Sequence, residues 1–155
     1  MGQVVLAQKN EWCILFDNMW QISSGYASAL RIYTREKGTQ GMEVTAKELA
    51  TRLEGTVLVD IRRVEEWHLT GVIPGSHQLT FFDAAGNADP DLWLRALADV
   101  ASPEDDLVLI CRSGHRTGVI LGFLQTQTRY TQARHLAGGI LSWLEKGLPV
   151  VAVKD

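Results

Sequence analysis

The sequence has few cysteines, no long apolar run and no excess of positive charge. Its two cysteines, Cys13 and Cys111, are too few for a disulfide framework or a cysteine-rich metal site. No stretch approaches the roughly 20 apolar residues that a membrane-spanning helix requires. The formal net charge is −3, which excludes general attraction to nucleic acid or to an anionic membrane surface. We therefore expect no nucleic-acid or membrane partner, and a reducing compartment, the cytoplasm, as location.

The composition that remains is that of one ordinary globular domain. Of the 155 residues, 46% are hydrophobic and 21% are charged, which is enough for a single core. Residues 1–41 differ from the rest, because polar residues interrupt each apolar patch and the polar segment REKGTQG then reads as a linker. We expect 1–41 to be a poorly ordered extension, or to lie outside a native product that starts at Met42. A transit peptide is the alternative. The domain itself is expected at 42–155.

From Met42 onward, short β-type segments alternate with helical ones. Strands are expected at 56–61, within 76–82, at 107–111 and at 133–136. Thr45 and Glu48 have the spacing of a capping box ahead of a short helix, and Asp89 is expected to cap a helix that begins at Pro90. Further helices are expected over 63–69, 117–128 and 140–147. The strand at 107–111 is apolar on both faces, as a central parallel strand should be. The helix at 117–128 is apolar nearly all round, which predicts burial. This alternation predicts an α/β fold with a mainly parallel central sheet and helices on both faces.

The segment LVLICRSGHRTGVILGFL, residues 107–124, places Cys111 between the most buried strand and the most buried helix. Ligands of open α/β sheets bind beyond the carboxyl ends of the strands. Residues 112–116 must turn the chain in few steps, and Gly114 permits backbone geometries that bulkier residues resist. Such a turn gathers backbone N–H groups at a helix N-terminus. We therefore expect an anion-binding loop with the Cys111 sulfur at its floor.

The charges around Cys111 favour its thiolate form. No acidic residue lies between Asp106 and Glu145, whereas four arginines do. Arg112 and Arg116 can offer paired donors to a sulfonate, a phosphate or another oxyanion. A buried, inert thiol is the alternative for a cysteine at the end of a strand, but an inert thiol has no need of two arginines and a glycine. We interpret Cys111 as a reactive thiolate.

Other polar residues receive more modest interpretations. His115 is a loop histidine and faces substrate at most. Asp60 and Arg62 follow the first strand, and we expect them to make structural hydrogen bonds near the site. The remaining histidines lack the spacing and the carboxylate neighbours of metal ligands, so no metal site is predicted: His68, His77 and His135.

Three motifs together resemble the rhodanese (sulfurtransferase) domain. VDIRRVEEWHLTGVIPGS is similar to its first signature, CRSGHR to its active loop, and LAGGILSWLEKGLPV to its closing signature. They span residues 44–150 in the expected order and spacing, and residues 1–41 lie outside the resemblance. Val72 stands where the family commonly has histidine, and we expect no catalytic consequence from this difference.

The resemblance implies a sulfur-transfer reaction. The Cys111 thiolate would attack the outer sulfur of a small anionic donor such as thiosulfate, release sulfite and become a persulfide. Cyanide, a thiol or a protein acceptor would then take the sulfur. The resemblance assigns substrate binding to the loop residues Arg112, Ser113, Gly114, His115 and Arg116, with Asp60 and Arg62 in support. No metal or organic cofactor is implied.

Two other functions remain open from the sequence. Phosphatases and arsenate reductases related to this fold use a C-x5-R loop that holds a tetrahedral oxyanion, whereas Cys111 to Arg116 is C-x4-R, a shorter loop that suits a bound sulfur atom better. Some members of the family are non-enzymatic regulatory or binding modules, but these often lack the cysteine that this chain keeps. Detoxification and sulfur relay would use the same loop.

Overall fold

The structure, a computed structural model, describes residues 41–153. Apart from Gly41, the expected extension at 1–41 lies outside the described residues, and so does Cys13. The described chain alternates strands and helices in the order that the sequence pattern predicts, with one short strand added at its start.

The centre of the domain is a five-stranded sheet in the described residues, and all of its strand pairs are parallel. Its strands are β1 (Glu43–Val44), β2 (Thr56–Asp60), β3 (His77–Gln78), β4 (Asp106–Ile110) and β5 (Arg134–Leu136), arranged as β1-β5-β4-β2-β3. β4 pairs with β2 along its whole length, from Thr56 opposite Asp106 to Asp60 opposite Ile110. The mainly parallel sheet is thus confirmed, with β4 at its centre.

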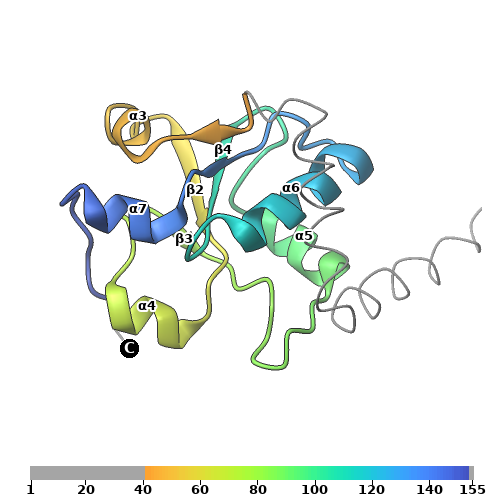
Figure 1. Ribbon diagram of the computed structural model, residues 1–155. Helices are drawn as coiled ribbons and strands as arrows, with labels where there is room; N and C mark the ends of the chain where they lie inside the picture. The colour runs from red at the N-terminus through yellow and green to blue at the C-terminus, as the bar shows by residue number, and fades with distance from the viewer. Residues whose placement is uncertain (1–40, 154–155) are drawn as a thin grey trace, which may run out of the picture. The chain divides into compact units, whose positions relative to one another are not determined.

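Helices cover both faces of this sheet (Figure 1). They are α3 (Ala46–Ala50), α4 (Val64–Thr70), α5 (Pro90–Ala98), α6 (His115–Gln127) and α7 (Gly139–Glu145). Alternate residues of β4 enter two separate cores: Leu107 and Leu109 pack with residues of α5 and α6, whereas Val108 and Ile110 pack with residues of α3 and α7. This alternation follows from the two-residue period of a strand. Among residues 41–153, no helix is both long and apolar enough to cross a membrane.

The predicted helix starts that rest on side-chain caps are confirmed. Thr45 and Glu48 form a reciprocal capping box at α3. Asp89 accepts the backbone N–H of Leu92 at 3.0 Å, with Pro90 as the first helical residue of α5. Local hydrogen-bonding chemistry therefore sets these boundaries.

The helix α6 differs from its prediction in two respects. It begins at His115, two residues earlier than expected, and only one of its faces is buried. Its buried residues are Thr117, Ile120, Leu121 and Leu124, whereas Gly118 and Thr126 are exposed. The prediction of burial all round was wrong, because the sheet covers one side of the helix and the glycines of the other side add no side chain that needs burial.

Candidate active site

Cys111 is the first residue after β4, at the carboxyl edge of the sheet. Its thiol is free and 1% exposed. The chain then turns through only three residues before α6 begins, and Gly114 makes the turn with a φ of 90°, a left-handed conformation that favours glycine. Because the helix starts early, His115 and Arg116 belong to its first turn instead of the loop.

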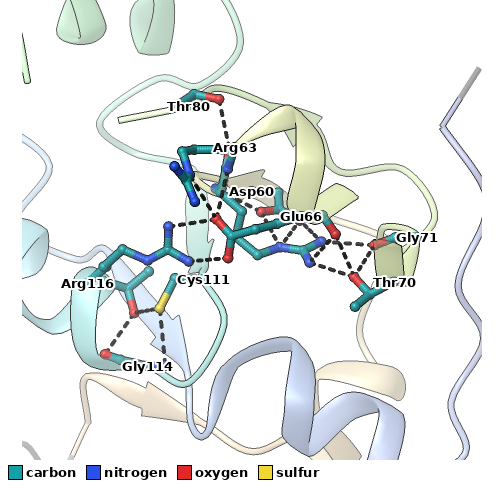
Figure 2. Close-up of polar contacts among 11 residues, drawn as sticks. Asp60, Arg63, Glu66, Thr70, Gly71, Thr80, Cys111, Gly114 and Arg116 are labelled. Carbon is teal, nitrogen blue, oxygen red and sulfur yellow. Dashed lines mark hydrogen bonds and ion pairs between the residues drawn. The ribbon is translucent and has the colours of Figure 1, made fainter. Parts of the chain in front are cut away.

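Two polar groups from this turn and helix contact the sulfur, and Figure 2 shows Gly114 beside Cys111. The backbone N–H of Gly114 donates to Cys111 Sγ at 3.1 Å, and the hydroxyl of Thr117 lies 3.4 Å from the same atom. Thr117 is fully buried in the first turn of α6, and its hydroxyl donates to the carbonyl oxygen of Gly114 at 3.0 Å. Thr117 was not among the residues predicted for the site, although a threonine six positions after a reactive cysteine, at the start of an apolar helix, could have suggested it.

Arg116 makes a two-pronged ion pair with Glu66 of α4, as Figure 2 shows. Its two terminal nitrogens donate to the two carboxylate oxygens at 2.9 and 2.5 Å. Burial by itself lowers the pKa of Arg116, but the hydrogen bond and charge of Glu66 outweigh it and raise that pKa. The structure therefore commits the Arg116 donors to a protein carboxylate, and it adds Glu66, which the sequence analysis left unassigned, to the site.

Arg112, Ser113 and His115 are the exposed residues of the turn and of the start of α6. Within the described chain, no acidic side chain forms an ion pair with Arg112. Its backbone is held, because its carbonyl oxygen accepts the N–H of Leu141 at 3.2 Å. Arg112 is thus the loop cation whose guanidinium is available to an anionic ligand.

Asp60 and Arg62 form a buried ion pair beside the site, with exposed side-chain fractions of 0% and 1%. Arg62 donates to both oxygens of Asp60 at 2.7 to 3.0 Å. Its remaining donors reach the end of α4, at the carbonyl oxygens of Glu66 and Gly71 and the hydroxyl of Thr70. The pair lies behind the site: it fixes α4, and α4 carries the carboxylate that holds Arg116.

The N-terminus of α7 packs directly on the backbone of the turn. The N–H of Ile140 donates to the carbonyl oxygen of Cys111 at 2.9 Å. A Cβ atom on Gly139 would lie 2.5 Å from that oxygen and from the Arg112 backbone, so only glycine allows this approach. The glycine pair of the closing signature therefore supports the loop that carries the thiol.

His135 lies on the inner side of the site and is 7% exposed. Its Nδ1 atom is 2.8 Å from the Thr117 hydroxyl, and its Nε2 atom is 3.3 Å from Glu43. Burial lowers the pKa of His135, and the charge and hydrogen bond of Glu43 offset this only in part. Over residues 41–153, no group of three or more His, Cys, Asp or Glu side chains is arranged to hold a metal ion.

The site contains one buried thiol, a backbone N–H that donates to its sulfur, a hydroxyl 3.4 Å from that sulfur, and an exposed arginine next to the cysteine in the chain. A backbone N–H directed at sulfur can stabilise negative charge that develops there during a reaction, and the thiolate is the nucleophilic form of cysteine. The arrangement can therefore carry out nucleophilic attack by sulfur on a small ligand, with a covalent adduct on Cys111.

The chain is similar in sequence to known proteins. The family model described as the Rhodanese-like domain matches residues 45–146. A sulfurtransferase from Allochromatium vinosum is 34% identical over 114 residues, which make up 71% of this chain and 94% of that protein.

Solved structures show the same fold. A rhodanese-related protein from Thermoplasma volcanium has a TM-score of 0.55 and 24% identity, over 72% of this chain and 98% of that one. A protein from Rhodopseudomonas palustris, described as a possible tyrosine phosphatase, has a TM-score of 0.58 and 22% identity, over 84% of this chain and 96% of that one. At these identities the likeness concerns the fold alone.

Proposed function

The chain belongs to the rhodanese-like domain family, and from that premise we propose that it is a sulfurtransferase with Cys111 as the sulfur carrier. The observation that best supports this proposal is the contact of the Cys111 sulfur with the Gly114 N–H at 3.1 Å, at the carboxyl edge of the sheet. A second support is the relative named sulfurtransferase, of which this chain covers 94%. A free nucleophilic thiol fits a reducing compartment such as the cytoplasm.

The proposed reaction has two steps. The Cys111 thiolate attacks the outer sulfur of a donor such as thiosulfate, a new S–S bond forms, and sulfite leaves with the electron pair of the broken S–S bond. The carbon of cyanide or the sulfur of a thiolate then attacks the outer sulfur of the persulfide, and Cys111 leaves as the thiolate. Neither step needs a cofactor.

In the proposed reaction, exposed residues bind the donor and buried groups stabilise charge on sulfur. Arg112 contacts the anionic part of the donor, and Ser113 and His115 lie beside it at the exposed side of the loop. The Gly114 N–H and the Thr117 hydroxyl stabilise charge on sulfur. Arg116 keeps the loop in place through Glu66. The acceptor is a small thiol or a protein thiol that approaches over Arg112.

The ion pair of Arg116 also bears on the phosphatase alternative. An arginine that binds a tetrahedral oxyanion needs free paired donors, and both terminal nitrogens of Arg116 are bonded to Glu66. The short C-x4-R loop agrees with this. Sulfur transfer is therefore favoured over phosphate hydrolysis, and the retained thiol favours an enzyme over a binding module.

We expect the full chain to transfer sulfur from thiosulfate to cyanide, and the Cys111→Ala variant to lose this activity. The rate of thiocyanate formation measures this, with thiol acceptors tested in parallel. Mass spectrometry after thiosulfate treatment should show a gain of one sulfur atom that Cys111→Ala abolishes. Cys13→Ser is the matched control and should keep both the activity and the adduct.

Two results would contradict the proposal. A folded wild-type protein that forms no sulfur adduct with thiosulfate or with a low-molecular-weight persulfide would favour a binding module. Faster hydrolysis of an aryl phosphate than transfer of sulfur would favour the phosphatase alternative.

A further inference from the structure

A row of polar side chains leads from the Cys111 sulfur away from the substrate side. Cys111 Sγ lies 3.4 Å from Thr117 Oγ1, which lies 2.8 Å from His135 Nδ1, and His135 Nε2 lies 3.3 Å from Glu43 Oε1. Thr117 and His135 are buried, whereas the side chain of Glu43 is 53% exposed. The row therefore joins the buried sulfur to a carboxylate in contact with solvent.

The sheet topology explains why these four residues meet. Cys111 follows β4, His135 is in the neighbouring strand β5, and Glu43 of β1 is paired directly with His135. Ala133, directly before β5, and Cys111 belong to the core that α6 covers, so His135, two residues after Ala133, points to the same side. Thr117 of α6 then fills the space between His135 and the sulfur.

The contact distances allow an arrangement of hydrogens from which a proton can pass along the row. With His135 neutral, its Nε2–H donates to Glu43 and its Nδ1 lone pair faces Thr117. The Thr117 hydroxyl lies 2.8 Å from that nitrogen and 3.0 Å from the carbonyl oxygen of Gly114, so its one hydrogen can be directed at either acceptor. When it is directed at His135, the Thr117 oxygen can accept the proton of the Cys111 thiol.

We infer that His135 is the positioning residue that accepts the proton of Cys111 through Thr117. The thiol gives its proton to Thr117 Oγ1 while the hydroxyl gives its own proton to His135 Nδ1. One S–H bond and one O–H bond break, and one O–H bond and one N–H bond form. The products are a thiolate that accepts the new Thr117 hydroxyl hydrogen and an imidazolium whose Nε2–H faces Glu43. The inference rests on the proposed role of Cys111 and adds the source of its thiolate.

The charges around His135 suit this role. Glu43 from β1 is the carboxylate that contacts it and stabilises its cationic form. Other charged groups nearby are neutralised by partners: Arg134, its neighbour on β5, pairs with Asp106, and Arg116 of α6 pairs with Glu66. Burial lowers the pKa of His135, whereas the charge and hydrogen bond of Glu43 and a backbone hydrogen bond of Gly114 raise it.

The test is the rate at which iodoacetamide alkylates Cys111, measured against pH in the full chain, with peptide mapping to separate Cys111 from Cys13. In His135→Asn and Thr117→Val we expect the rate at neutral pH to fall about 10-fold, because loss of the proton acceptor leaves less of the reactive thiolate. The whole profile should move to higher pH for the same reason. Thr117→Ser keeps the hydroxyl and should restore the wild-type profile. Glu43→Gln should move the pH profile in the same direction but by a smaller amount, because the Glu43 side chain is half-exposed.

His77→Asn is the matched control, because His77 is an exposed histidine on β3, and its profile should equal that of the wild type. Folded His135→Asn protein with an unchanged profile overturns the inference. If that variant does not fold, the alkylation profiles of Thr117→Val and Thr117→Ser are compared. Equal profiles for these two variants overturn the inference. Alkylation needs no sulfur donor and can be measured without sulfurtransferase activity. If the wild type transfers no sulfur but the variants change the alkylation profile as described, the proposed function is refuted and His135 is still the proton acceptor.

Discussion

At the scale of single residues, Arg112 and Arg116 carry the same charge but have different surroundings. Arg116 gives its paired donors to Glu66, and Arg112 is exposed with no ion pair to a described acidic residue. A charged hydrogen bond to a ligand contributes about 1.5 to 3 kcal/mol. In the proposed reaction Arg112 would make such a hydrogen bond to the donor, whereas Arg116 makes its hydrogen bonds to Glu66 within the fold.

We expect Arg112→Ala to raise the KM for thiosulfate about 10-fold, the lower end of the loss of one charged hydrogen bond, with a smaller effect on kcat. Steady-state kinetics at low and high salt measure this, and salt should narrow the difference because it screens exposed charges. Arg129→Ala is the control, since Arg129 is 83% exposed and paired with Glu104. An equal rise in KM for both variants would mean that net charge, not Arg112, attracts the donor.

At the scale of secondary-structure elements, the site depends on how closely α7 approaches the turn after β4. The first N–H groups of α7 donate to the carbonyl oxygens of Cys111 and Arg112. This packing requires glycine at position 139 for two reasons, a φ of 60° and a Cβ position 2.5 Å from the turn. The helix thereby fixes the direction in which the Gly114 N–H points at sulfur.

Gly139→Ala should therefore lower both stability and sulfur transfer. The left-handed conformation alone costs about 1–2 kcal/mol for a residue with a Cβ, and the clash adds to this and displaces the turn. Gly147→Ala is a matched control, because Gly147 has a φ of 63° but nothing within 4 Å of its Cβ position. Urea unfolding should show destabilisation in both variants, and the thiosulfate–cyanide assay a loss in Gly139→Ala only. Loss of activity in Gly147→Ala as well would attribute the effect to general destabilisation.

Element boundaries were predictable where neighbouring residues in the chain determine them. The capping box of Thr45 and Glu48 and the Asp89-Pro90 start of α5 are local chemistry, and both predictions are confirmed. β1 was missed, because two residues are too few to show an alternating pattern and its pairing partner lies at the other end of the domain. The start of α6 was placed too late because Gly114 alone makes the sharp step of the turn.

At the scale of the whole molecule, the sheet and the thiol follow from sequence pattern, whereas the partners of the thiol do not. Cys111 stands directly after the most apolar strand, so its place at the sheet edge could be predicted. Glu66 and Arg116 are 50 residues apart in the chain, and Thr117 and His135 are 18 apart. These contacts depend on how β5 and α4 lie beside β4, which no local spacing encodes.

Two carboxylates, Glu66 and Asp106, form ion pairs with arginines far away in the chain and make the stability of the domain depend on pH. Burial raises the pKa of Glu66, but hydrogen bonds from Arg116 and the Arg63 N–H outweigh it and hold that pKa below its ordinary value of 4.5. Burial also raises the pKa of Asp106, but the hydrogen bonds and charges of Arg52 and Arg134 outweigh it and hold that pKa below its ordinary value of 3.8. A carboxyl group whose pKa is lower in the folded state stabilises that state fully above its unfolded pKa. The stabilisation is lost as pH falls through the folded-state pKa.

We therefore expect the free energy of unfolding to stay level at neutral pH and to decline once the pH drops below the ordinary pKa of these carboxyl groups. Urea unfolding across this range measures it. Glu66→Gln should be less stable than the wild type by about 1.5–3 kcal/mol at neutral pH, as expected for a charged hydrogen bond. This gap should narrow in acid, because protonation removes the same charge from the wild type. Asp91→Asn, at an exposed position of α5, is the control for loss of one surface carboxylate. A gap that stays constant down to acid pH would show that Glu66 stabilises the domain through its shape and packing, and that its charge has no part in holding Arg116.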